Sequence, residues 1–121
     1  MAKITGVGGI FFKSRDPKAL AAWYRDVLGL ATEDWGGARF PASAGGPPFL
    51  LWAPFPADTK YFAPSTRDFM INFAVDDIDG FIAGLEDKGI EIAGREDADP
   101  NGRFAWIVDP EGNKIELWEP K

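Results

Sequence analysis

Apolar and polar residues alternate along the chain in an order that occurs twice. Residues 4–14 alternate with period two, which predicts a β-strand, and a helical pattern follows and ends at Gly29. Residues 69–75 predict a second strand, and a second helical pattern after it ends at Gly89. An internal repeat of this kind makes each half of the chain one supersecondary unit. We therefore expect two modules of the same design.

Both predicted helices begin at an aspartate. Asp16 is a good N-cap and Pro17 suits the first helical position, and Asp76 and Asp77 precede the second helix in the same way. Apolar residues recur at the spacing of one helix face: Leu20, Trp23, Tyr24, Val27 and Leu28 in the first helix, and Ile78, Phe81, Ile82 and Leu85 in the second. We expect both stripes to lie in the hydrophobic core.

Three short strands are expected after each helix, because short β-forming runs alternate there with turn residues. They lie near 30–35, 38–43 and 48–53 in the first half and near 90–95, 103–108 and 114–119 in the second. The predicted fold class is therefore α+β, with module one at about 4–54 and module two at about 69–120. The linker between them, 55–68, carries Tyr61 and Phe62 and is either packed against the body, a lid over a ligand or an arm of a dimer.

Composition narrows the possible chemistry. The 121 residues, 45% of them hydrophobic and 26% charged, are typical of one globular domain. The chain has no cysteine and no histidine, which excludes thiolate ligands, disulfides, and the commonest general base and metal ligand. A net charge of −6 without a Lys/Arg cluster argues against nucleic acid and favours a cationic ligand, although a solvated acidic surface explains it equally well. Without a long apolar run or a signal-peptide pattern, we expect a cytoplasmic protein with no membrane partner.

The end of the chain places an acidic residue in the middle of a strand. In residues 115–120 the side chains alternate between two faces, so Glu116 and Trp118 share one face. Residues 49–54 resemble this stretch, with Leu50 standing where Glu116 does and Ala53 where Glu119 does. The acid is therefore either an exposed charge or a site residue.

Several short motifs stand in a specific order and spacing: Lys13 to Pro17, Trp23-Tyr24, Leu28 to Leu30, Phe73 to Asp79, Asp109 to Asn113, and Ile115 to Leu117. On these motifs the chain, over about residues 4–120, resembles the vicinal oxygen chelate superfamily of glyoxalases, bleomycin resistance proteins and extradiol dioxygenases. The resemblance implies two tandem βαβββ modules, each curling into half of an open barrel. It does not imply one reaction, because the superfamily hosts several.

The resemblance also implies a place for a metal. In the enzymes of the superfamily a divalent metal lies in the concavity of the barrel, usually held by His or Glu at four positions. Those positions correspond here to Gly9, Leu50, Met70 and Glu116, and only Glu116 has a ligand atom in its side chain. Because zinc sites need three or four protein ligands, we expect neither a metal site nor a cofactor in this chain.

The strand alternation, anchored on these four positions, predicts the lining of a small-molecule pocket: Phe11, Leu50, Trp52, Met70, Asn72, Lys114, Glu116 and Trp118. Gly9 is expected to leave room for a ligand. The opposite strand faces are expected to pack under the helices: Ile10, Phe12, Phe49, Leu51, Ile71, Phe73, Val75, Ile115 and Leu117. Trp52 and Trp118 either stack on a ligand or fill the barrel or a dimer interface.

Three functions fit these expectations. The first is a metal-free protein that binds or sequesters a cationic or aromatic small molecule, and such proteins of the superfamily are usually homodimers. The second is a lyase or isomerase with Glu116 as general base, although it would lack the metal that stabilises an enolate. The third is a non-catalytic dimerisation domain, which predicts a filled concavity. The expected partners are thus a small molecule and a second copy of the chain.

Overall fold

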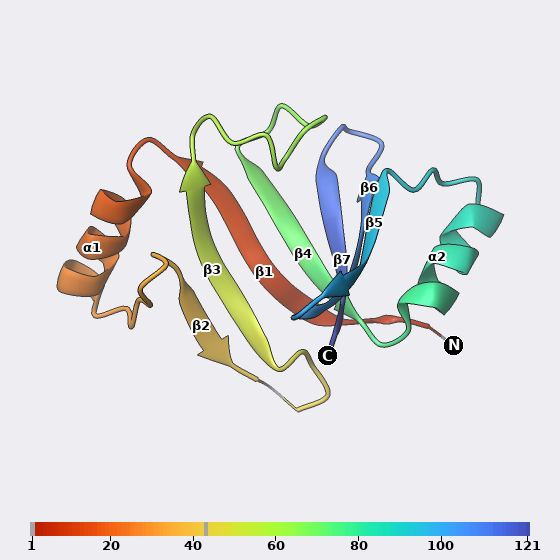
Figure 1. The fold of residues 1–121 in the computed structure, drawn as a ribbon, viewed down its shortest axis with the longest axis horizontal. Helices are drawn as coiled ribbons and strands as arrows, with labels where there is room; N and C mark the ends of the chain where they lie inside the picture. Colours follow the sequence, from red (N-terminus) through yellow and green to blue (C-terminus); the bar gives the residue numbers. More distant parts are fainter. Residues whose placement is uncertain (1, 43) are drawn as a thin grey trace.

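The computed structural model describes residues 2–42 and 44–121, which form one curved sheet and two helices (Figure 1). The elements are β1 (Ile4–Ser14), α1 (Pro17–Leu28), β2 (Ala38–Pro41), β3 (Phe49–Pro56), β4 (Phe69–Val75), α2 (Ile78–Asp87), β5 (Gly94–Asp99), β6 (Gly102–Val108) and β7 (Lys114–Pro120). The seven strands lie in the order β2-β3-β1-β4-β7-β6-β5. The sheet is open, because its edge strands β2 and β5 lie at opposite ends of this order.

The strand pairing confirms the predicted α+β fold of two tandem modules. The first strands of the modules, β1 and β4, pair antiparallel at the centre of the sheet. Each of them pairs in parallel with the last strand of its own module, β1 with β3 and β4 with β7. The two halves therefore continue one sheet, and corresponding strands lie on either side of its middle.

Two of the predicted strands are wrong. Residues 30–35 form no strand, because Glu33 and Gly37 close a turn in which the amide of Glu33 donates to the carbonyl of Gly37 at 2.7 Å. Residues 90–95 hold only the start of β5, because the amide of Ile90 donates to the carbonyl of Leu85 at 3.0 Å and so ends α2. Module one consequently has one strand fewer than module two.

Both helices begin as their sequences predict. The side chain of Asp16 accepts a hydrogen bond from the amide of Ala19 at 3.1 Å, and Asp77 accepts one from Gly80 at 3.1 Å. The first helix ends at Gly29, whose φ of 73° is the left-handed conformation that glycine adopts without strain. No helix in residues 2–42 and 44–121 is long and apolar enough to cross a bilayer.

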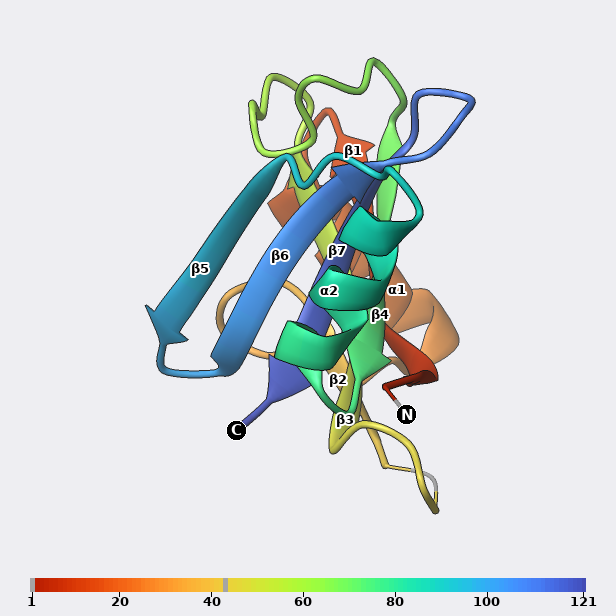
Figure 2. The same ribbon diagram turned by 90° about the vertical axis from the view of Figure 1, so that its right-hand side faces the viewer.

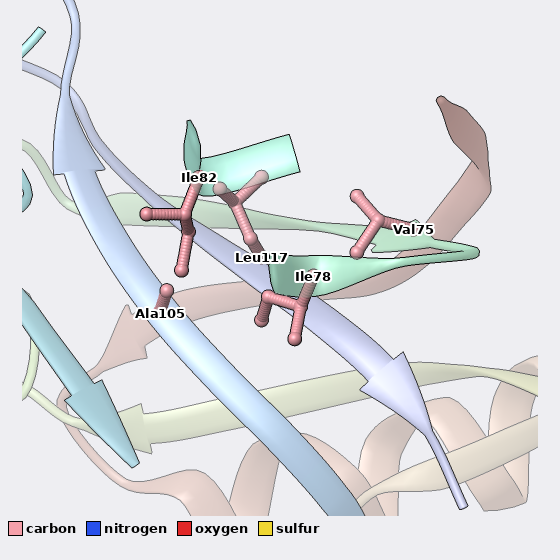
Figure 3. Packing of buried hydrophobic residues seen from close by; sticks show 5 residues of the cluster. All are labelled: Val75, Ile78, Ile82, Ala105 and Leu117. Carbon is pink, nitrogen blue, oxygen red and sulfur yellow. The ribbon is translucent and has the colours of Figure 1, made fainter. Parts of the chain in front are cut away.

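The helix α2 covers the main core of module two. It lies against β6 and β7 (Figure 2). Its side chains Ile78 and Ile82 are buried. Figure 3 shows these two residues pointing toward Val75, Ala105 and Leu117, which come from β4, β6 and β7. The stripe predicted for this helix therefore lies in the core, as expected.

The stripe of α1 is different, and the prediction that it lies in the core is wrong for much of its length. Ala21 is buried and the ring of Tyr24 lies 4.6 Å from that of Trp52, so this side of α1 rests on the sheet. Trp23 and Val27, on the neighbouring flank, are 51% and 60% exposed. The expected homodimer stays a prediction.

Candidate functional site

A cavity of about 450 Å³ lies on the concave face of the sheet, opposite the helices. Much of its wall is aromatic: Phe11, Trp35, Phe49, Phe55, Tyr61, Phe104 and Trp118. The polar side chains that line it are Arg39, Tyr61, Asn72, Asn101 and Glu116. This size, with apolar walls and few polar groups, is typical of a small-molecule site.

Glu116 is the acidic residue of this cavity and is only 2% exposed. The sheet register places it beside Asn72 on β4 and beside Trp106 on β6. Its Oε2 accepts a hydrogen bond from Asn72 Nδ2 at 2.7 Å, and its Oε1 accepts one from Trp106 Nε1 at 2.9 Å. The hydroxyl of Tyr61 also donates to Oε1. The buried carboxylate is therefore satisfied by three neutral donors.

Tyr61 reaches Glu116 from the segment between β3 and β4. Its ring stacks on Phe55 with centroids 5.6 Å apart and planes 5° apart, and its neighbour Phe62 is buried in the core. Burial and the nearby charge of Glu116 raise the pKa of Tyr61 above its ordinary range, so the phenol stays protonated and donates. Phe62 is therefore packed against the body of the protein, while Tyr61 forms part of the cavity wall.

Lys114 supports this wall from behind. Its Nζ donates to the carbonyl oxygen of Tyr61 at 2.8 Å and lies 5.3 Å from the centre of the Tyr61 ring. Burial lowers the pKa of Lys114, and the charge of Glu116 opposes that change. Lys114 does not line the cavity, so it holds the segment that carries Tyr61.

An aromatic stack forms one wall of the cavity. Phe104 lies between Trp106 and Trp118, with centroids 6.3 Å away on each side and planes within 12° and 10°. The stack arises because Phe104 and Trp106 share one face of β6, and Trp118 is the register partner of Phe104 on β7. Trp118 is buried, and its Nε1 donates to the carbonyl oxygen of Asn101 at 3.0 Å, which fixes the ring.

The structure brings four of the predicted pocket residues to the cavity: Phe11, Asn72, Glu116 and Trp118. Met70 is fully buried beside Phe11 in the core next to the cavity. Lys114 lies behind Tyr61, as described above. The remaining two, Leu50 and Trp52, lie on the other face of β3, and their predicted orientation is wrong.

The error at Leu50 and Trp52 has a simple geometric cause. The register of the parallel strands pairs Phe11 with Ala53 and Asn72 with Glu116, so Ala53 occupies the place in module one that Glu116 occupies in module two. Matching Leu50 to Glu116 by residue type shifts β3 by three positions, and an odd shift exchanges the faces of a strand. Phe49 and Leu51, predicted to lie under α1, therefore line the cavity.

Gly9 does not provide the predicted space for a ligand. A Cβ atom placed on Gly9 would lie 2.6 Å from Cε1 and 2.7 Å from Cζ of the Phe11 ring. The ring of Phe11 thus fills the volume that the missing side chain leaves. Gly9 itself does not line the cavity, whereas Phe11 does.

The sequence reasoning missed two residues that bind Glu116. Trp106 could have been found, because the turn at residues 109–113 pairs Val108 with Lys114 and therefore Trp106 with Glu116. Tyr61 offers no such signal, since its segment has no hydrophobic period and reaches the site through tertiary packing.

The side chains around Glu116 do not fit the divalent metal that the fold implies. In the described ranges, which omit only residues 1 and 43, no group of three or more His, Cys, Asp or Glu side chains comes together. The groups closest to the carboxylate are donors, and their hydrogens point at the oxygen atoms that a metal would need. The site is instead a charged acceptor in an aromatic cavity.

The fold is that of the vicinal oxygen chelate superfamily. A family model described as a glyoxalase-like domain matches residues 9–118, and the chain belongs to that family. No curated protein sequence matches the chain.

Solved structures share the fold at low sequence identity. A methylmalonyl-CoA epimerase from Streptomyces coelicolor matches with a TM-score of 0.65 and 22% identity over 98% of this chain and 99% of its own. The epimerase from Mycobacterium tuberculosis matches at 0.62 and 23%, over 98% and 89%. A 2,2',3-trihydroxybiphenyl 1,2-dioxygenase from Sphingomonas wittichii matches at 0.61 and 19%, over 98% of this chain and 42% of its own. These likenesses concern the fold.

Proposed function

We propose that the protein binds a small cationic or aromatic molecule in the concave cavity and that it does so without a metal. The observation that carries the proposal is the buried carboxylate of Glu116, held by three neutral donors beside the stacked rings of Phe104 and Trp118. Neutral donors stabilise the carboxylate without cancelling its charge, so the cavity attracts a cation.

The magnitudes agree with binding. An aromatic ligand that buries about 200 Å² against the stacked rings gains about 5 kcal/mol at about 25 cal/mol per Å². A charge-assisted hydrogen bond to Glu116 adds about 1.5–3 kcal/mol. Micromolar affinity needs about 8 kcal/mol, so these two contributions reach it only when both are present. An aromatic cation is therefore the ligand that uses the whole site.

The two other functions receive less support. Catalysis with Glu116 as general base could use only Oε2, because Oε1 already accepts two hydrogen bonds. The fold neighbours include epimerases and a dioxygenase, but at 19–23% identity they show the fold alone. A non-catalytic domain predicts a filled concavity, whereas the cavity holds about 450 Å³.

Calorimetric titration of the chelator-treated protein tests the proposal. The panel contains aromatic cations, their neutral isosteres and aromatic carboxylates of the same size. We expect the cations to bind with micromolar affinity, and we expect Glu116→Gln to weaken them about tenfold or more while the neutral compounds change little. If no compound binds, or if the carboxylates bind best, the proposal is wrong. Binding that requires added metal ions would also overturn it.

A further inference from the structure

We propose that the ligand's cationic group carries N–H bonds, as a protonated amine or amidine does, and that Asn72 selects it over a quaternary ammonium. This inference rests on the proposed function, because it names the class of cation that the same cavity takes. The observation behind it is a buried acceptor atom without a partner, Oδ1 of Asn72.

The orientation of the Asn72 amide is fixed by Glu116. Asn72 is 2% exposed, and its Nδ2 donates to Oε2 of Glu116 at 2.7 Å. The reverse orientation would bring the amide oxygen against the carboxylate, two acceptors facing each other. Oδ1 therefore points away from Glu116, and within residues 2–42 and 44–121 it accepts no hydrogen bond. A buried acceptor in this state is destabilising until a donor reaches it.

The surroundings of Oδ1 place it at the cavity wall. A Cβ atom built on Gly8 would lie 2.5 Å from Asn72 Oδ1 and 2.7 Å from Cε3 of Trp118, and all three residues line the cavity. The absence of a side chain at Gly8 thus lets Asn72 Oδ1 and the Trp118 ring pack closely against β1, side by side. The orphan oxygen lies next to the ring on which an aromatic ligand would stack.

The second acceptor is the carboxylate itself. Oε1 of Glu116 accepts from two donors, whereas Oε2 accepts only from Asn72. A carboxylate oxygen has about two lone-pair directions, so Oε2 keeps one open. The Asn72 amide thus brings two acceptors together, each able to accept one more hydrogen bond. They are its own neutral Oδ1 and the charged Oε2 of Glu116.

An ammonium or amidinium group matches this pair, because it has at least two N–H donors on one small cation. It can donate to both oxygens while an attached ring stacks on Trp118. A quaternary ammonium brings the same charge and the same contact with aromatic rings but leaves Asn72 Oδ1 unpaired. Sites built to bond a polar hydrogen discriminate strongly against analogues that lack it.

Three probes that share a 2-naphthylmethyl group test the inference: 2-naphthylmethylammonium, its N,N,N-trimethyl derivative and neutral 2-naphthylmethanol. Each is titrated into the 121-residue protein at pH 7 by calorimetry. We expect the primary ammonium to bind about tenfold or more tightly than the trimethyl compound, which is the ratio that one charge-assisted hydrogen bond gives. Asn72→Leu should lower that ratio, because only the hydrogen bond to Oε2 of Glu116 then distinguishes the two cations.

Asn113→Leu is the matched control. Asn113 also has a buried Oδ1 without a partner among the described residues, but it lies in the turn before β7, donates to Asp109 at 2.8 Å and does not line the cavity. This variant should keep the wild-type ratio. Equal binding of the two cations overturns the inference and leaves the proposed function standing. A ratio that survives Asn72→Leu removes Asn72 from the selection, and failure of every probe and panel compound overturns both proposals.

Discussion

The hydroxyl of Tyr61 donates to the carboxylate of Glu116, although 55 residues separate them in the chain. The contact joins the segment between the modules to the last strand of the sheet. Because the pKa of Tyr61 is raised by burial and by Glu116, the phenol remains the donor and the carboxylate the acceptor. The protein therefore fixes which group donates and which group accepts at this point of the cavity wall.

Removing this hydroxyl should destabilise the fold. We expect Tyr61→Phe to lower the free energy of unfolding by about 1–3 kcal/mol, because Oε1 of Glu116 loses a donor while it stays buried. Urea unfolding at pH 7 measures the change. Tyr24→Phe is the control, since it removes the same atom from a ring that packs on Trp52 away from the cavity. Equal losses in both variants would show that the bond to Glu116 adds nothing.

The same variant separates structure from ligand binding. In Tyr61→Phe, Oε1 of Glu116 has an unused lone pair, so cation affinity should stay the same or rise. Calorimetry with an aromatic cation measures this. A tenfold loss of affinity would instead mean that the hydroxyl contacts the ligand directly.

Buried Trp118 and half-buried Trp52 should differ in their effect on binding. Trp118 lines the cavity, whereas Trp52 contacts Phe12 and Tyr24 on the helix face of the sheet. Both Trp118→Leu and Trp52→Leu should cost stability by about 2–4 kcal/mol, because each leaves a void in a packed region. Only Trp118→Leu should weaken an aromatic ligand, by about tenfold or more. Titrations at a temperature where both variants are folded test this, and equal losses of affinity would contradict the assigned strand faces.

The architecture was predictable from the sequence because it rests on local signals. The aspartate caps and the alternation in residues 69–75 and 114–119 place elements that later packing does not move. The faces of β3 were not predictable in this way, because residue types in 49–54 match 115–120 at an offset that the strand register does not use. A register is decided by the neighbouring strand, and the sequence of one strand does not contain it.

The site residues that lie on regular strands were predictable from the sequence, and the one between the strands was not. Glu116, Asn72 and Trp118 share faces of well-defined strands, so the alternation located them. Tyr61 lies in a segment with no period, and the burial of Phe62 beside it depends on the whole core. Its contact with Glu116 is a consequence of tertiary structure.

The close contact between Gly9 and Phe11 predicts a rescue. Gly9→Ala should lower the free energy of unfolding by about 1–3 kcal/mol, because the new Cβ would lie 2.6 Å from the Phe11 ring. Phe11→Leu removes the ring atoms involved, so Gly9→Ala should cost at least about 1 kcal/mol less in that background. Urea unfolding of the four proteins of this double-mutant cycle measures the coupling. Additive losses would mean that the ring moves aside at no cost.

An exposed network of ion pairs predicts how stability depends on pH. Asp79 at the start of α2 pairs with Arg95 on β5 and with Arg103 on β6, and Asp97 pairs with both arginines. Hydrogen bonds from Arg103 and then Arg95 hold the pKa of Asp79 well below its ordinary value. A carboxyl of this kind stabilises the fold above its unfolded pKa of about 3.9, and the stabilisation is lost as the pH falls through the lower folded pKa.

Asp79→Asn should therefore flatten the acid side of the stability curve. Urea unfolding between pH 2 and pH 7 should show a smaller decline for this variant than for the wild type below about pH 4. Because Asp79 is exposed, about 1 M salt should reduce the difference. Asp87→Asn, in the last turn of the same helix and outside the network, should keep the wild-type curve. If the two variants decline alike, the network does not link α2 to the edge strands energetically.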